Sequence, residues 1–410
     1  MNKKNILAWA VLGIFSMFVL FSLAVAQEDK GFESFKEERT GEFKQYAKER
    51  EKEFQEYREK LENAFQEYKK SVAKVWGEEN AVIPSKKEWV QYRKNMQERN
   101  IVDFQEGKVK VEVALSEDKL DTSSERENHL LDAVLNTLNA SADTRSIVEI
   151  AKDPTPPEKK GEEPVLKGQV ENKQGEKVSK ENAKEFAKQV AQEDNIQTSK
   201  QEDQEGKERV IASVEFDLVP DHLQKRVKKF LPLVKKEAEK RELDAALVLA
   251  LIETESYFNP TARSHIPAFG LMQLVPTSGG KDAYEFVYGE EKAPKDDFLY
   301  QPDKNVQLGT AYMYLIFEHY LDGIEDPKSR MWCSVAAYNT GSGNVLRTFA
   351  GKYSQSGYST RKRWKEAALE KINSMSSEEV YQYLRNELPY KETRRYVKKI
   401  KNKMSHYSQS

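Results

Sequence analysis

Aromatic residues recur every eleven positions in a highly charged segment near the N-terminus of this 410-residue chain. The residues between them are almost all Glu, Lys, Arg and Gln. Eleven residues correspond closely to three turns of an α-helix, so the aromatic side chains form one narrow stripe. The spacing therefore predicts a long, continuous helix over residues 31–70. The repeat consists of Phe32, Phe43, Phe54 and Phe65, each followed three positions later by Phe35, Tyr46, Tyr57 or Tyr68.

Two functions of this helix fit the stripe. As a charged spacer, assigned to residues 27–71, the helix would pack its stripe on its own domain, as most apolar helical stripes do. As a stalk, it would self-associate through residues 31–70 or lie on a surface. The pattern favours the spacer and leaves self-association open as the alternative.

Residues 1–26 have the features of a secretory signal peptide. Two lysines precede an uncharged apolar stretch over 6–26, which ends in Ala24-Val25-Ala26. These features predict export with cleavage after Ala26. The stretch is also near the ~20 residues that span a bilayer, so a retained membrane anchor is the alternative. Both outcomes place the remaining chain in the periplasm or cell envelope, and no cysteine follows the stretch to accept a lipid.

Composition excludes several classes of protein. The single cysteine, Cys333, cannot form an intrachain disulfide or a cysteine-based zinc site, and the five histidines show no metal-ligand spacing. We therefore expect no metal. Residues 220–410 carry 30 Lys/Arg against 24 Asp/Glu. This excess suits an anionic polymer but is too small to indicate binding of nucleic acid.

The middle of the chain, residues 72–219, mixes strand and helix patterns. Val109, Val111 and Val113 alternate with charged residues, and a similar alternation occupies 210–219, as in half-buried strands. Helical patterns lie between them at His129–Leu138 and Ala183–Val190, and the polar segment 192–207 resembles a loop. Strands and helices in this order predict a small α+β domain.

From residue 220 onward one helical pattern follows another, which predicts a mostly α-helical domain over 220–410. One of these helices, starting after the capping residue Asp244, is almost purely apolar and therefore buried. It ends in two acids, Glu253 and Glu255. Burial disfavours the charged form of a carboxyl group and thereby suits it to act as an acid catalyst. Two residues apart on a helix, the acids face different ways, so one is a catalytic candidate and the other is expected to be solvated. The alternative is that both are surface carboxylates.

Five short motifs follow this helix in a fixed order. They are Glu255-Ser256-x-Phe258-Asn259-Pro260, Gly270-Leu271-Met272-Gln273, Asn305-x-x-x-Gly309-x-x-Tyr312, Ala337-Tyr338-Asn339-x-Gly341 and Glu392-Thr393-Arg394-x-Tyr396-Val397. In order and content they resemble the signature motifs of the soluble-lytic-transglycosylase family, whose fold resembles goose-type lysozyme. The segment Ala73–Phe104, and later Val210–Arg226, is similar to the N-terminal domain of membrane-bound lytic murein transglycosylases.

The resemblance implies a lysozyme-like catalytic domain over 220–410 with a role for each motif. Glu255 would be the catalytic acid. The remaining positions would bind the glycan, with Tyr338 donating a hydrogen bond to Glu255 or to the developing charge. These substrate-binding residues are Ser256, Met272, Gln273, Tyr338, Asn339 and Glu392.

The implied chemistry needs only one carboxylate and no cofactor. The glutamic acid would protonate the oxygen between N-acetylmuramate and N-acetylglucosamine in peptidoglycan strands. It would then deprotonate the muramoyl C6 hydroxyl, which closes on C1 to give a 1,6-anhydro end. A hydrolytic lysozyme would need a second carboxylate, for which Asp296, Asp297 and Glu392 are candidates. A non-catalytic wall-binding scaffold is the other alternative.

Overall fold

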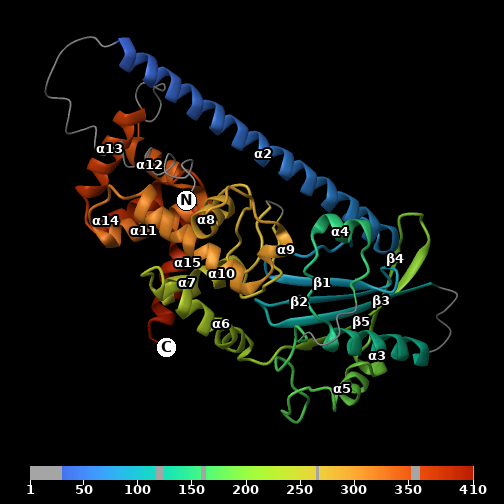
Figure 1. The fold of residues 1–410 in the computed structure, drawn as a ribbon. Coiled ribbons are helices and arrows are strands. Elements are labelled where there is room, and N and C mark those ends of the chain that lie inside the picture. The colour runs from blue at the N-terminus through green and yellow to red at the C-terminus, as the bar shows by residue number, and fades with distance from the viewer. Residues whose placement is uncertain (1–29, 117–122, 158–162, 265–266, 352–360, 410) are drawn as a thin grey trace. The chain divides into compact units, whose positions relative to one another are not determined.

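The computed structural model of the protein describes residues 30–116, 123–157, 163–264, 267–351 and 361–409 (Figure 1). It divides between Glu53 and Phe54 into two units. The predicted signal peptide at 1–26 lies outside the described residues. Within the described ranges, no helix combines the length and the apolarity that crossing a membrane requires.

Helix α2 (Lys30–Trp76) confirms the predicted continuous helix. It continues past the predicted end because Val72 and Trp76 extend its apolar face, and Trp76 Nε1 donates to the Met96 carbonyl at 2.7 Å. In the second unit its buried residues recur at helical spacing, namely Leu61, Ala64, Phe65, Tyr68, Val72 and Trp76. The aromatic stripe therefore packs on its own domain here. The side chains of the first two repeats lie outside those that the structure describes, and self-association stays a prediction.

The next elements form a five-stranded antiparallel sheet in the order β1-β2-β3-β5-β4. Helices α3 and α5 cover one face, and the buried side of α2 packs with the other face together with α4 (Figure 1). The strands are β1 (Glu88–Arg93), β2 (Glu98–Asp103), β3 (Lys108–Ser116), β4 (Gln197–Glu202) and β5 (Glu208–Asp217). The helices are α3 (Ser123–Asn139), α4 (Ile147–Lys152) and α5 (Ala183–Val190).

The α+β prediction is confirmed, and both alternating segments are strands. They pair directly, with Val109 opposite Phe216 and Val111 opposite Val214. The segment 192–207, predicted to be a loop, instead contains a short 3₁₀ turn (Glu193–Asn195) and β4. The polar strand β4 lies at the sheet edge, where exposed side chains leave no apolar alternation for sequence analysis to detect.

The rest of the chain is mostly α-helical in its described parts, as predicted, with turns and two isolated β-bridges between α7 and α8. At its centre lies α7 (Ala245–Glu255), whose residues from Ala246 to Ile252 are all buried. The other helices are α6 (His222–Glu239), α8 (Gly279–Tyr288), α9 (Asp296–Leu299), α10 (Pro302–Leu315) with a π-helical turn (Ile316–Tyr320), α11 (Pro327–Thr340), α12 (Ser342–Ala350), α13 (Arg361–Asn373), α14 (Ser377–Glu387) and α15 (Lys391–Tyr407). Packing around α7 brings α6, α11 and α15 together.

Candidate active site

Glu255 is the last residue of the buried helix α7, and its side chain is only 6% exposed. The chain turns sharply after Ser256, where Tyr257 and Phe258 have positive φ angles of 54° and 60°. Residues other than glycine avoid this left-handed region, at a cost of about 1 kcal/mol each. The turn persists because Phe258 is completely buried and stacks on Phe230 of α6. Packing therefore fixes the position at which Glu255 is presented.

Glu253 and Glu255 face different partners, as the helical spacing predicted. Glu253 accepts a hydrogen bond from the Tyr407 hydroxyl at 2.7 Å, and its carboxylate lies 3.1 Å from Nζ of Lys403. Both partners belong to α15. The expectation that the second acid is solvated is wrong, because Glu253 is buried and joins α7 to α15.

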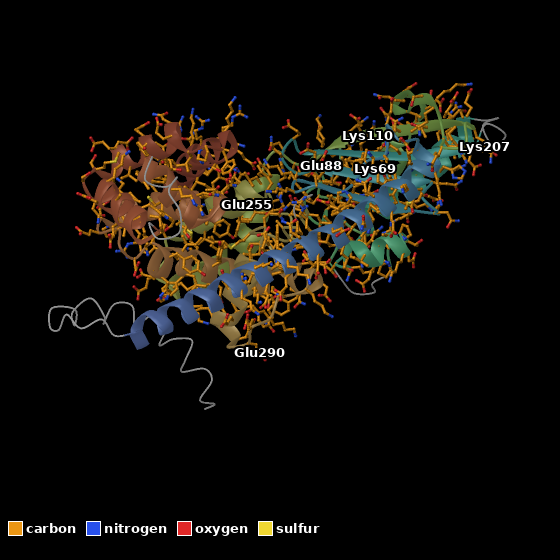
Figure 2. All side chains as sticks on the ribbon, turned by 90° about the horizontal axis from the view of Figure 1, so that it is seen from above. Lys69, Glu88, Lys110, Lys207, Glu255 and Glu290 are labelled. Atoms are coloured by element: carbon orange, nitrogen blue, oxygen red, sulfur yellow. The ribbon has the colours of Figure 1, made fainter. Side chains whose placement is uncertain are left out.

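Two tyrosines and one lysine surround Glu255. Burial, and secondly the charge of Glu255, raise the pKa values of Tyr338 and Tyr396, so both phenols stay protonated. The hydroxyl of Tyr396 is buried beside Glu255 but has no well-formed hydrogen bond to any described residue. Nζ of Lys86, in the loop before β1, lies 3.4 Å from Oε2 of Glu255. The acid is therefore bordered by donors from three distant parts of the chain. Figure 2 marks it where the helical part meets the sheet.

Tyr338 binds the backbone of the second motif. Its hydroxyl donates to the Met272 carbonyl at 2.8 Å, and so it does not donate to Glu255 in this structure. The Ser256 hydroxyl is also directed inward, to the Leu271 carbonyl at 2.8 Å, and the side chain is completely buried. Ser256 thus holds the end of α7 to the second motif and does not line an open surface.

Asn305 holds the second motif from the other side. Its Nδ2 donates to the carbonyls of Phe269 and Leu299, both at 2.8 Å, and its Oδ1 accepts from the Met272 amide at 2.7 Å. Gly270 has φ +76°, and a Cβ there would lie 2.3 Å from the Asn305 amide nitrogen. This close approach explains why the second motif has a glycine at position 270, next to the asparagine that the third motif has at position 305.

The predicted Met272 and Gln273 are both buried. The Met272 side chain packs against Gly309, where a Cβ would lie 2.3 Å from its sulfur. Gln273 Nε2 donates to the carbonyls of Ala262 and Gly270, at 3.1 and 3.0 Å. Gln273 Oε1 is itself buried and has no hydrogen-bond partner among the described residues.

The late motif contributes two residues that sequence analysis did not assign. Thr393 Oγ1 donates to Oδ1 of the predicted Asn339 at 2.7 Å, and Tyr396 borders Glu255. The predicted Glu392 is exposed on the first turn of α15. The sequence motif pointed to this segment, because Glu392, Thr393 and Tyr396 all belong to it. The geometry of the helix, however, turns Thr393 and Tyr396 inward and leaves Glu392 at the surface.

Asp296 and Asp297 were candidate second carboxylates. Asp297 is exposed, whereas Asp296 is buried at the start of α9. Burial raises the pKa of Asp296, and the nearby Arg263 opposes that rise. The charge of Asp296 also acts on Tyr57 of α2. Asp296 thus belongs to a polar cluster beneath α2.

Arg226 of α6 joins the helical part to the sheet. Its guanidinium is buried and donates to Gln169 Oε1 at 2.6 Å, to the Phe104 carbonyl at 3.1 Å and to the Tyr257 carbonyl at 3.3 Å. Burial lowers its pKa to about 10, so the group stays charged at neutral pH. This contact fixes the sheet, and with it Lys86, beside the turn that follows Glu255.

We expect Arg226→Met to lower the free energy of unfolding by about 2–4 kcal/mol, because two buried acceptors lose their donor. Chemical denaturation followed by circular dichroism measures this change. The exposed neighbour Lys228, replaced by Met, is the control and should change stability by less than ~0.5 kcal/mol. Equal effects of the two substitutions would show that the contact does not hold the parts together.

Comparison with known proteins identifies first the class and then the family. The family model "Transglycosylase SLT domain" matches residues 232–360. The model of the N-terminal domain of membrane-bound lytic murein transglycosylase C matches 54–229. The chain belongs to the membrane-bound lytic murein transglycosylase C family, because relatives of that name are over 30% identical along most of their length.

Three relatives named membrane-bound lytic murein transglycosylase C illustrate this match. The Salmonella typhimurium protein is 34% identical over 338 residues, which cover 82% of this chain and 86% of that protein. The Serratia proteamaculans protein is 34% identical over 346 residues, with 82% and 87% covered. The Haemophilus influenzae protein is 31% identical over 331 residues, with 80% and 84% covered. Among solved structures, the 70 kDa soluble lytic transglycosylase of Escherichia coli is 23% identical, with 46% of this chain and 26% of that chain covered and a TM-score of 0.33.

Proposed function

We propose that this lytic transglycosylase is exported to the cell envelope and cleaves the β-1,4 bond between N-acetylmuramate and N-acetylglucosamine in peptidoglycan, leaving 1,6-anhydromuramoyl ends. The observation that carries the proposal is the buried Glu255 at the end of α7, with the protonated phenols of Tyr338 and Tyr396 beside it. Family membership supports the class of substrate, because the relatives are named for murein.

In the proposed reaction Glu255 acts twice. It first donates a proton to the glycosidic oxygen as the bond from that oxygen to C1 breaks, which leaves positive charge on the muramoyl ring. It then accepts the proton of the C6 hydroxyl as O6 bonds to C1. The proton lost in the first step is regained in the second, so no water is consumed. Because the nucleophile belongs to the same sugar, proximity replaces a second carboxylate.

The other residues of the site position the glycan and the acid. The Tyr396 hydroxyl, which lacks an ordinary hydrogen bond within the described structure, can donate to Glu255 once a substrate is bound. Asn339, oriented by Thr393, can bind sugar hydroxyl or amide groups, whereas the buried Oε1 of Gln273 would have to turn outward to do so. Ser256 acts through the backbone that its hydroxyl holds, and Met272 through its own backbone, which Asn305 and Tyr338 fix, whereas Glu392 can contact glycan from the surface.

The three proposed activities differ in their products when peptidoglycan is digested in oxygen-18 water. We expect mass spectrometry to find unlabelled 1,6-anhydromuramoyl ends, because ring closure excludes water. Labelled reducing ends as the main product would instead establish a hydrolytic lysozyme. Absence of any product would favour the wall-binding scaffold.

The N-terminal segment supports the proposal of envelope location. Its basic start and apolar stretch would direct export, after which the segment is either removed behind Ala26 or retained as an anchor. The relatives' names include the term membrane-bound, which supports association with a membrane. The mass of the mature protein isolated from its envelope distinguishes the two outcomes, because cleavage removes the first 26 residues.

A further inference from the structure

A hollow of about 430 Å³ opens beside the lysine that contacts Glu255. Its lining includes Lys86 and Lys87 from the loop before β1, Arg263 from the turn region after α7, and the acids Glu88 and Asp103. Lys86 reaches from this hollow to the carboxylate of Glu255, 3.4 Å away, while its own side chain stays 38% exposed. One cation is thus shared between the hollow and the candidate catalytic acid.

The two acids of the hollow are bound by their own turns. Asp103 Oδ1 accepts hydrogen bonds from the backbone amides of Gln105 and Glu106, at 2.8 and 2.9 Å. Glu88 accepts from the hydroxyl of Ser85 at 2.9 Å. These carboxylates stabilise the loops around the hollow, and the ion-pair partner of Lys86 is Glu255 rather than either of them.

The lining of the hollow carries three cations, Lys86, Lys87 and Arg263, against two acids. Burial lowers the pKa of Lys87, and the nearby charges of Lys403 and Lys399 lower it further. The Arg263 guanidinium is buried and donates to the carbonyls of Asp143 and Arg145, but its Nη1 has no partner among the described residues. Cations that are crowded or incompletely paired favour an anionic ligand.

The contact between Lys86 and Glu255 conflicts with acid catalysis. The Lys86 ammonium lies 3.4 Å from Oε2 of Glu255 and so competes for this oxygen with the glycosidic oxygen that is to receive the proton. Something must therefore draw Lys86 away before the reaction. The muramoyl sugar, whose bond is cleaved in the proposed function, also carries the peptide stem of peptidoglycan, and that stem has free carboxylates.

We propose, on the basis of the proposed function, that the hollow binds the peptide stem of the substrate. A carboxylate of the stem then replaces Glu255 as the ion-pair partner of Lys86. Oε2 of Glu255 is then free to approach the glycosidic oxygen as the general acid. When the product leaves, Lys86 returns to Glu255. The protein would in this way cleave strands that carry stems in preference to strands that do not, with Lys86 as the positioning residue.

Substrates matched in shape but not in charge test this proposal. Isolated peptidoglycan is compared with the same material after carbodiimide coupling with ammonia, which converts stem carboxylates into neutral amides. We expect the intact protein to cleave native strands about tenfold faster in kcat/KM than amidated ones, the effect of one charge-assisted contact. In Lys86→Met the ratio should fall to about one, while Lys86→Arg should retain it. Lys69→Met is the matched control on exposed α2 surface (Figure 2) and should keep the full ratio.

Two further measurements separate this role from others. On amidated strands, kcat should be higher in Lys86→Met than in the intact protein while KM stays the same, because no ammonium then occupies Oε2 of Glu255. A purely structural lysine would give an equal or lower kcat, and that result would overturn the proposal. Strands stripped of stems by an amidase expose the muramoyl lactyl carboxylate. Cleavage of stripped strands as fast as native ones would assign the exchange to that carboxylate and overturn binding of the stem.

Failure of the inference and failure of the proposed function give different results. Equal rates on native and amidated strands, with anhydro products from both, would overturn only the role of the stem. Anhydro products from none of the substrates, with any variant, would overturn the proposed reaction itself.

Discussion

Replacement of Glu255 by glutamine is expected to lower the rate of peptidoglycan cleavage at least ~100-fold, since glutamine keeps the shape of the side chain but can neither donate nor accept the proton. Folding should be preserved, because Glu255 ends α7 and the hydrophobic packing of that helix does not depend on its charge. Release of soluble fragments from purified peptidoglycan measures the rate, and co-sedimentation with peptidoglycan measures binding, which should remain.

The neighbouring acid provides the matched control. Glu253→Gln should retain most of the activity, but should lower stability by about 1–3 kcal/mol because Lys403 loses its charged partner. If Glu255→Gln kept more than about a tenth of the activity, the acid would lie elsewhere. Loss of activity in Glu253→Gln alone would identify that residue as the acid.

Deletion of residues 1–71, which leaves a chain that starts at Val72, is expected to unfold the protein or to lower its free energy of unfolding by more than about 6 kcal/mol. This deletion removes Leu61, Phe65 and Tyr68, and the loss of each large core residue costs about 2–5 kcal/mol. A chain that starts at Phe54 keeps all three and should unfold at nearly the same denaturant concentration as the full chain. Both chains are measured by chemical denaturation and by cleavage of peptidoglycan.

A single substitution distinguishes packing from a general effect of chain length. Phe65→Ala in the full chain should cost about 3–5 kcal/mol, whereas the exposed neighbour Gln66→Ala should have little effect. A chain from Val72 that folds as stably as the full chain would show that the part of α2 before Val72 contributes no core. Concentration-dependent sedimentation that disappears when the chain starts at Phe54 would support self-association through residues 31–70.

Sequence patterns predicted the elements whose signals are local. The eleven-residue period indicated α2, alternation indicated β3 and β5, and an apolar run ending in acids indicated α7. The strand β4 carried no such signal, because an edge strand with exposed polar residues buries neither face. The packing of the stripe was one of two alternatives until the burial of Phe65 and Tyr68 decided it for the described repeats.

Motifs identified the segments of the site better than the function of each side chain in it. Resemblance selected Ser256 and Met272; the Ser256 side chain holds backbone in place, whereas the backbone of Met272 is itself held by Asn305 and Tyr338. It selected Glu392, whereas Thr393 and Tyr396 of the same motif face the site. Lys86 could not be predicted from the sequence, because no local pattern connects it to a glutamate 169 positions later.

The long distance in sequence between Lys86 and Glu255 also affects the stage of folding at which the site forms. Contacts between residues far apart in sequence form late in folding, because closing a long loop costs entropy before the contact stabilises it. The surroundings of Glu255 need the loop before β1, the end of α7 and the last helix, α15, which reaches almost to the C-terminus. A nascent chain therefore lacks a complete site, and the ability to cut the wall should arise only once the entire chain has folded.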